Sequence, residues 1–351
     1  MRSRTAAGLL LAALSAALLA GCTSVVAGTG HRAGTTTSGN HPTSGSRSTS
    51  GPNSSAATTP AVAAKYARTP LSTAIGDPVT ADLCAAIGLG PLQSAVTGLT
   101  PSFDGRQFPP GCSVTYFQGA TAQFGVSAFA EAGPPRTAAG RTTRTESGRS
   151  VYVYPFDAAG RCERDIVARN VLLVVDATPL GSVKPDKANY CAATDAMSAR
   201  LAAAVGDPGG AVPRLSLARP SVSGFDACKV VRAAKITSLS AFAKGTVASQ
   251  GFGASCRVHP TGLYLFVNLV VADAPHPGGA TTTVVSGHTM YATSTSSDFC
   301  SYASTQGRTR DGHYEQLVFA ATATDPAKAP PALCQQTSQA AAMYLTTAGL
   351  H

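Results

Sequence analysis

Short runs of β-branched and aromatic residues alternate with polar segments from about residue 66 onward. Such runs predict β-strands. In the first half of this region the predicted strands are CSVTYF (112–117), AQFGVSAFA (122–130), SVYVYPF (150–156) and NVLLVVDAT (170–178). In the second half they are CRVH (256–259), YLFVNLVVA (264–272), TMYATS (289–294) and EQLVFAATA (315–323). The run 263–272 is apolar almost throughout but too short to cross a membrane, so it predicts a buried strand.

Helical patterns stand at both ends of each half. The first half opens with TADLCAAIGL (80–89) and the second with GFDACKVVRAAKI (224–236). The helix that closes the first half has one apolar stripe, formed by Met197, Leu201 and Val205 at spacings of four residues. Each half therefore predicts an antiparallel sheet flanked by an N-terminal and a C-terminal helix, an α+β fold.

The two halves are a duplication. The chain has nine cysteines, and the eight that follow Cys22 form two sets of four with similar spacing. Short motifs repeat beside them, such as DLC and DAC, or SGRSVY and SGHTMY. A stretch rich in Pro and Gly at residues 206–220 marks the join. We expect two tandem homologous domains, 66–207 and 216–351.

The eight cysteines predict disulfides, because an even number in an exported chain is typical of an oxidised framework. Metal binding is the alternative, but no C-x2-C pair is present. Four cysteines in each half allow three connectivities. Sequential pairing closes short loops and is the one we expect. The pairs would be Cys84–Cys112, Cys162–Cys191, Cys228–Cys256 and Cys300–Cys334.

The N-terminus predicts export and a lipid anchor. Residues 1–21 have a basic start and an apolar stretch too short to span a bilayer, as in a signal peptide. This stretch ends in Leu-Ala-Gly-Cys22, which resembles a bacterial lipobox, although a chance cysteine at the end of a signal is the alternative. An acylated Cys22 would hold the protein at the extracytoplasmic face of the cell membrane.

Residues 22–65 predict a disordered tether. The stretch from 29 to 60 is rich in Ser, Thr and Gly and contains no Leu, Ile, Phe or Tyr. Such a segment cannot bury enough apolar surface to offset its loss of conformational entropy. The tether would lift the folded domains off the membrane.

The formal net charge of +9 raises the question of an anionic partner. Nucleic acid is not expected, because the protein is exported and has no basic run interleaved with aromatic residues. One arginine-rich stretch, expected on a loop between strands, is a candidate contact for an anionic glycan or lipid. The alternative is a solvated charged loop. Its members are Arg136, Arg141, Arg144 and Arg149.

Catalytic and metal motifs are not apparent in the sequence. No G-x-S-x-G, H-E-x-x-H, P-loop or S-x-x-K motif occurs. Asp82 and Asp226 recur at equivalent positions and could look catalytic, but capping of a helix N-terminus is the simpler interpretation. The second half carries four histidines that could form a metal site, and their irregular spacing favours surface positions: His259, His276, His288 and His313. We therefore predict no enzyme, metal or cofactor.

The order of motifs in each half resembles the DUF3558 family of actinobacterial lipoproteins. In the first half these motifs are Asp82-Leu83-Cys84, Gly111-Cys112, Ser147-Gly148, Cys162 and Cys191-Ala192-Ala193. In the second half they are Asp226-Ala227-Cys228, Ser255-Cys256, Ser286-Gly287, Cys300 and Cys334. Val114 and Val258 stand where the family often has tryptophan. The resemblance implies an envelope protein and supplies no catalytic residues.

Three functions remain open from the sequence. The first is a non-catalytic module that binds an envelope lipid or glycan, with its ligand groove between the domains. The second is an adaptor or sensor that binds other envelope proteins. The third is a hydrolase whose catalytic residues come together only in the fold.

Overall fold

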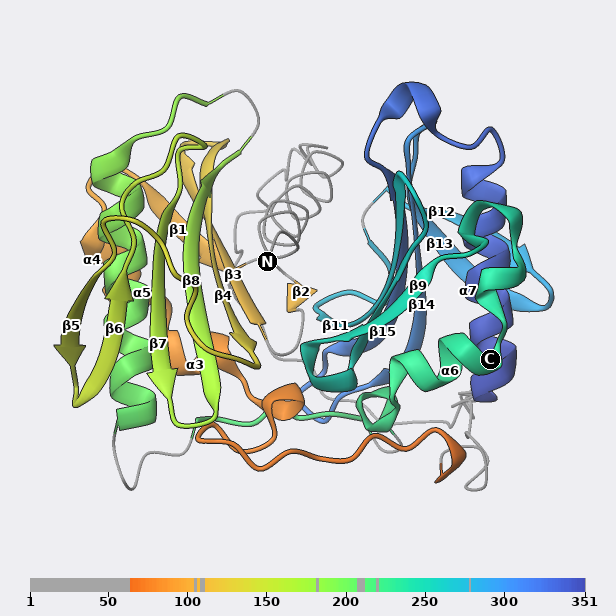
Figure 1. The fold of residues 1–351 in the computed structure, drawn as a ribbon, viewed down its shortest axis with the longest axis horizontal. Helices are drawn as coiled ribbons and strands as arrows, with labels where there is room; N and C mark the ends of the chain where they lie inside the picture. Colours follow the sequence, from red (N-terminus) through yellow and green to blue (C-terminus); the bar gives the residue numbers. More distant parts are fainter. Residues whose placement is uncertain are drawn as a thin grey trace, which may run out of the picture.

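The computed structural model describes residues 64–103, 106–107, 111–180, 183–206, 212–218, 221–277 and 279–350 (Figure 1). The predicted signal peptide, Cys22 and nearly all of the predicted tether lie outside the described residues. No helix of the described part is both long and apolar enough to cross a membrane.

The first domain is a seven-stranded antiparallel sheet with helices at both ends of its sequence. Asp82 caps the first helix by accepting a hydrogen bond from the amide of Ala85 at 2.9 Å. The predicted helix 80–89 is shorter than expected, because Gly88 has a φ of 68° and separates two short helices. The helices are α3 (Leu83–Ile87), α4 (Leu89–Ala95) and α5 (Lys187–Gly206). The strands are β1 (Thr100–Phe103), β3 (Gly111–Gln118), β4 (Thr121–Glu131), β5 (Thr142–Glu146), β6 (Arg149–Val153), β7 (Cys162–Ala168) and β8 (Val171–Pro179).

The second domain repeats this plan. Asp226 caps its first helix through the amide of Lys229 at 3.0 Å. The predicted buried strand 263–272 is confirmed as β11. The helices are α6 (Ala227–Ala233) and α7 (Leu333–Ala348). The strands are β9 (Thr246–Gln250), β10 (Ser255–His259), β11 (Leu263–Ala272), β12 (Thr281–Val285), β13 (His288–Thr295), β14 (Phe299–Arg308) and β15 (Tyr314–Ala323).

The two sheets have the same topology. The order β5-β6-β7-β8-β4-β3-β1 in the first domain corresponds, strand for strand, to β12-β13-β14-β15-β11-β10-β9 in the second. The register agrees as well, since Cys162 pairs with Ala177 and Cys300 with Ala321. The short strand β2 (Arg106–Gln107) is not part of this common strand order; it pairs with the end of β11 in the second domain. The predicted α+β fold with two antiparallel domains is confirmed.

Each domain is held together by two disulfides, and each disulfide joins a helix to a strand. The structure contains the four sequential pairs, Cys84–Cys112, Cys162–Cys191, Cys228–Cys256 and Cys300–Cys334. A disulfide stabilises a small domain by about 2–4 kcal/mol. Disulfides in this number indicate an oxidising, extracytoplasmic environment.

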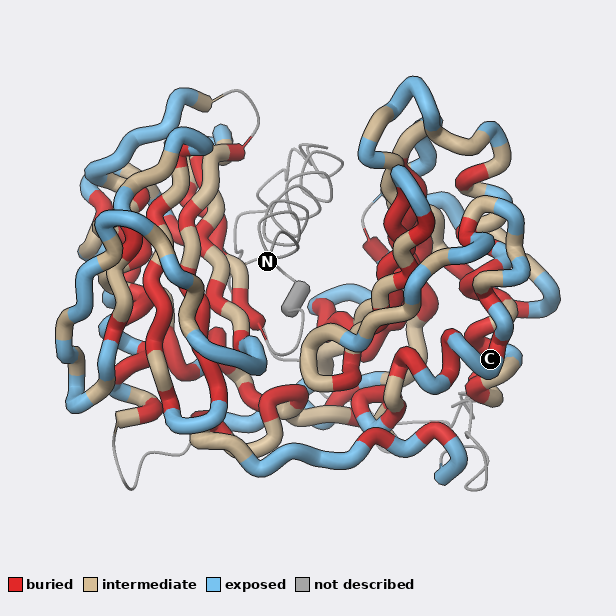
Figure 2. The backbone as a smooth tube through the Cα atoms, in the orientation of Figure 1, coloured by how far each residue is buried: buried red, intermediate tan, exposed pale blue. Residues whose placement is uncertain are grey.

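The helices cover one face of each sheet and form its hydrophobic core there (Figure 2). In β4 every second residue is buried, because alternate side chains point to the helices. Tyr116 and Phe124 stack in the first core with ring centroids 4.6 Å apart, and Tyr190 of α5 packs against Phe124. The other face of the first sheet is more exposed to solvent. We call the faces away from the helices the open faces.

The open faces are turned toward each other, because α5 and α7 lie on the outer sides of the molecule (Figure 1). Two segments cross between the domains. One of these segments contains Tyr66, which is buried in the core of the second domain, and Arg68, which forms an ion pair with Asp77 at 2.5 Å. In the second, residues 212–218 pair with the first domain, where the amide of Asp82 donates to the carbonyl of Pro213 at 2.8 Å.

Candidate functional site

A cavity of about 330 Å³ lies where the two domains meet. The first domain contributes residues of α3 and β1, and the second contributes the end of β11 and the turn between β14 and β15. The crossing segment 212–218 supplies the remaining wall. The lining residues are Asp82, Cys84, Ala85, Phe103, Leu215, Ser216, Val271, Asp273, Thr309, Asp311 and His313.

The cavity has an acidic, hydrogen-bonding lining although the protein as a whole is basic. Asp273 Oδ1 and His313 Nδ1 lie 2.8 Å apart, within hydrogen-bonding distance. The hydroxyl of Thr309 donates to Asp311 at 2.5 Å. Three aspartates, two hydroxyls and one imidazole suit a small polar or cationic ligand, and Phe103 and Val271 add apolar surface.

The Asp273–His313 pair resembles part of a catalytic triad, in which a carboxylate orients a histidine through Nδ1. A triad also requires a nucleophile bonded to Nε2. Among the described residues, no hydroxyl is hydrogen-bonded to Nε2 of His313, and the Thr309 hydroxyl is already bonded to Asp311 and to the carbonyl of His313. The side chains of His313 and Asp273 are 44% and 68% exposed. Among the described residues, therefore, no complete triad forms at His313.

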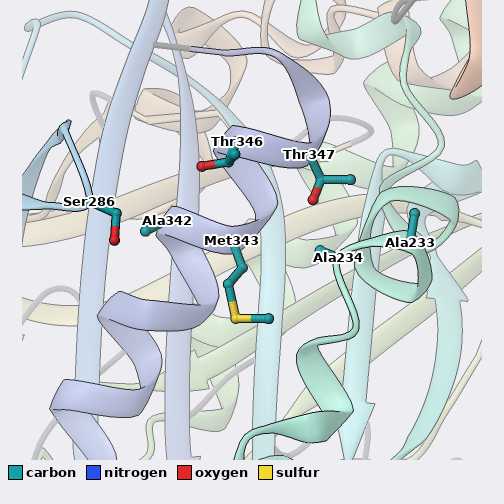
Figure 3. Close-up of a pocket in the computed structure, with 7 residues that line it drawn as sticks. All are labelled: Ala233, Ala234, Ser286, Ala342, Met343, Thr346 and Thr347. Carbon is teal, nitrogen blue, oxygen red and sulfur yellow. The ribbon is translucent and has the colours of Figure 1, made fainter.

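A second, more open hollow of about 230 Å³ lies on the outer side of the second domain, between α7 and the end of α6 (Figure 3). Met343 projects between these two helices, and no charged side chain lines the hollow. Its lining residues are Ala233, Ala234, Ser286, Ala342, Met343, Thr346 and Thr347. It offers few groups that could orient a ligand.

The open face of the first sheet carries several carboxylates. Glu163 on β7 and Asp176 on β8 are direct partners across the two strands, and Asp165 lies two residues further along β7. Burial is the main cause that raises the pKa of Asp176 to about 7; the nearby Glu163 and Glu131 contribute to this rise, and Arg161 opposes it. Burial also raises the pKa of Asp165 to about 6.

The corresponding positions in the second sheet carry no charge. The equal register assigns Ser301, Ala303 and Ala320 as counterparts of Glu163, Asp165 and Asp176. The aromatic side chains of Tyr264, Phe266 and Phe299 instead form a small buried cluster with Ala320 on this face. The two copies of the domain have therefore diverged most visibly on their open faces.

The four candidate arginines do not form one group. The expectation that all lie on a loop is wrong for Arg144 and Arg149, which lie on β5 and β6. These two face the helix side, where Arg144 pairs with Glu146 and Asp195 of α5. Arg149 donates to the carbonyl of Val205, near the end of α5, at 2.6 Å.

Arg136 and Arg141 do lie on the loop before β5 and reach the open face. Arg136 pairs with Glu163 at 2.5 Å and lies 4.0 Å above the ring of Tyr154. Arg141 lies 4.5 Å above the ring of Tyr152. These arginines already have intramolecular partners, so contact with an anionic ligand stays a prediction.

The four histidines of the second half are dispersed. His259 stacks on Tyr264, His276 lies beside Tyr291, and His288 is within 2.8 Å of the Thr346 hydroxyl. His313 lies in the cavity wall. Within the described parts of the chain, no group of three or more His, Cys, Asp or Glu side chains could hold a metal ion.

The sequence does not predict that most of these residues line the cavity or the acidic open face. Asp82 was expected only as a helix cap, which it is, but it also lines the cavity. Asp273 and Asp311 carry no sequence signal of a binding site, because each stands in a turn at the end of a strand. Asp176 directly follows the apolar run 171–175 within the predicted strand 170–178, and this charged position is a sequence signal for the acidic face.

Comparisons with known proteins leave the family open. No family model matches the chain, and no curated protein matches it. A search of solved structures found the crystal structure of the di-domain ARO/CYC BexL from the BE-7585A biosynthetic pathway. The similarity has 10% sequence identity and a TM-score of 0.16, and covers 77% of this chain and 95% of the other.

Proposed function

We propose that this protein is an exported lipoprotein of the cell envelope, anchored through Cys22, that binds a small ligand without chemical conversion. In this proposal it is a distant, tandem member of the DUF3558 family from an actinobacterium. The observation that carries the proposal is the cavity of about 330 Å³ formed jointly by the two domains and the segment that connects them.

The position of the cavity supports ligand binding. Ligand sites occur preferentially at domain interfaces, and a volume near 300 Å³ is at the lower end of small-molecule sites. A ligand here would contact both domains at once and would therefore stabilise their arrangement. The aspartates favour a ligand with hydroxyl or amino groups, such as a glycan unit or an amine, over an anionic one.

Native mass spectrometry of the lipidated protein, extracted gently from its own membranes, tests this proposal. We expect a small-molecule adduct beyond the mass of the acylated chain. The exposed Ala85 lines the cavity, so an Ala85→Trp variant should lose the adduct. Ala233→Trp is the matched control, because Ala233 is also an exposed helical alanine but lines the outer hollow.

The outcomes separate the candidate functions. Bare wild-type protein in repeated extractions, or an adduct that survives Ala85→Trp, would contradict the cavity as the ligand site. A second protein in place of a small adduct would support the adaptor alternative instead.

A further inference from the structure

The carboxylates on the open face of the first sheet lie in an arrangement that is costly for the fold. Glu163 and Asp176 are directly opposite each other on β7 and β8. Like charges in this relation destabilise a sheet. Arg136 pairs with Glu163, whereas Asp176 forms no side-chain ion pair among the described residues, and the nearby Arg161 is paired with Asp157. One carboxylate of the pair thus has no ion-pair partner of its own.

Asp165, on the same face, has a buried carboxylate oxygen that lacks a hydrogen-bond partner among the described residues. The residue is 1% exposed, and its Oδ2 accepts a hydrogen bond from the hydroxyl of Tyr154 at 2.5 Å. Its Oδ1 is buried and has no hydrogen-bond partner among the described residues. Buried polar atoms without a partner are rare in native proteins and call for an explanation. Asp176 is only half-buried, so a ligand can reach this face.

The second domain serves as an internal control for the fold. It has the same strand order and register, yet Ser301, Ala303 and Ala320 occupy the positions of Glu163, Asp165 and Asp176. The fold therefore does not require carboxylates there. Residues that break a local rule without a structural benefit are expected at functional sites.

The same face already holds cations supplied by the protein itself. The guanidinium of Arg136 combines an ion pair to Glu163 with a position above the ring of Tyr154. The guanidinium of Arg141 lies above Tyr152 in a similar way. Carboxylates beside phenol rings are a favourable environment for ammonium and guanidinium groups.

We propose that the open face of the first sheet binds an organic cation, an ammonium or guanidinium group, through the half-buried Asp176, with the buried carboxylate of Asp165 adding negative charge on the same face. A metal ion is not the proposed ligand, because the described carboxylates are not grouped closely enough to hold one. The site is separate from the cavity and rests on the proposed function only in assigning the protein a binding role. The net charge of +9 repels cations in general, so binding would reflect local attraction.

Dansylcadaverine, which carries one primary ammonium group, is a suitable probe. We would titrate it into the full-length lipidated protein in phosphatidylcholine nanodiscs at pH 8 and follow its fluorescence anisotropy, with empty nanodiscs as the blank. We expect saturable binding that weakens at least tenfold for Asp176→Asn and for Asp165→Asn. N-acetylated dansylcadaverine, which lacks the charge, should bind at least tenfold more weakly than the amine.

Asp298→Asn is the matched control. It removes the same charge from the turn before β14 in the second domain, where Asp298 accepts a hydrogen bond from Ser296. We expect its affinity to equal that of the wild type. Circular dichroism would verify that each variant is folded. Because Asp176→Asn and Asp165→Asn are both tested, the proposal can still be judged if one of them does not fold.

Equal affinity of the wild type and both aspartate variants, or of the two probes, would overturn the proposal. So would a loss of binding in Asp298→Asn as large as that in Asp176→Asn, because the effect would then reflect overall charge. These results leave the adduct test with Ala85→Trp unaffected, so failure of this site can be distinguished from failure of the cavity.

Discussion

Replacing Asp176 by alanine should stabilise the protein at neutral and alkaline pH. The pKa of Asp176 is raised from 3.8 to about 7, chiefly because burial penalises its charged form. Between pH 4 and 7 the folded state therefore binds more protons at this residue than the unfolded state. The contribution of Asp176 to stability falls as pH rises through this window, and above pH 7 it is fully unfavourable.

The magnitude follows from the size of the shift. Each pKa unit corresponds to about 1.4 kcal/mol, so a change of about three units sets an upper limit of about 4 kcal/mol. Asp176 is only half-buried, and water and ions screen part of this cost. We expect Asp176→Ala to stabilise the protein by about 1–3 kcal/mol at pH 8. In a protein of this size that would raise the melting temperature by several degrees.

Thermal unfolding followed by far-ultraviolet circular dichroism, with the lipidated protein in detergent at pH 4 and pH 8, measures this effect. The gain should be large at pH 8 and small at pH 4, where the carboxyl is protonated in the folded state and already partly protonated in the unfolded state, whose pKa is 3.8. The reciprocal change, Ala320→Asp, puts a carboxylate at the equivalent position of the second domain and should lower the melting temperature at pH 8. A variant Asp176→Ala that is less stable than wild type at pH 8, or equally shifted at both pH values, would refute the reasoning.

Three further variants test other parts of the structure. Asp82→Ala removes the cap of α3 and should cost about 1 kcal/mol, measured as a lower melting temperature. Replacing Cys84 and Cys112 together by serine should cost about 2–4 kcal/mol, measured against the same protein with its disulfides intact. Glu315→Ala removes a buried carboxylate that accepts hydrogen bonds from Ala218, Ser221 and Val222, so proteolysis of the segment between the domains should become faster.

The fold was largely predictable because the duplicated sequence shows the same pattern of cysteines and apolar runs twice. The cysteine spacing and the strong apolar runs indicated both domains, and β11 was found with its bounds. The charged strand β7 was missed, since Glu163, Arg164 and Asp165 in succession do not resemble a strand. In the fold these charges have distant partners: Arg164 donates to Asp195 of α5 at 2.7 Å, and Glu163 pairs with Arg136.

The candidate sites were less predictable, because they depend on contacts between residues distant in the sequence. Asp82 and His313 line one cavity only because residues 212–218 pair with the first domain and then continue into the second. The sequence pattern within one helix or strand does not indicate which residues of the other domain it will contact. Likewise, the grouping of four arginines along the sequence does not reveal that Arg144 lies on β5 and faces the helix side, whereas Arg141 lies on the loop before β5 and reaches the open side.

Differences between the two copies are the most informative guide to function in this protein. Features that both copies share, such as the helix caps and the disulfides, are explained by the stability of the fold. Features that one copy has and the other lacks must be explained in another way, because the second copy shows that the fold forms without them. Asp165 and Asp176 belong to this second kind, and each is costly where it stands. A variant that gains stability and loses affinity for an ammonium group would show that binding is the reason for that cost.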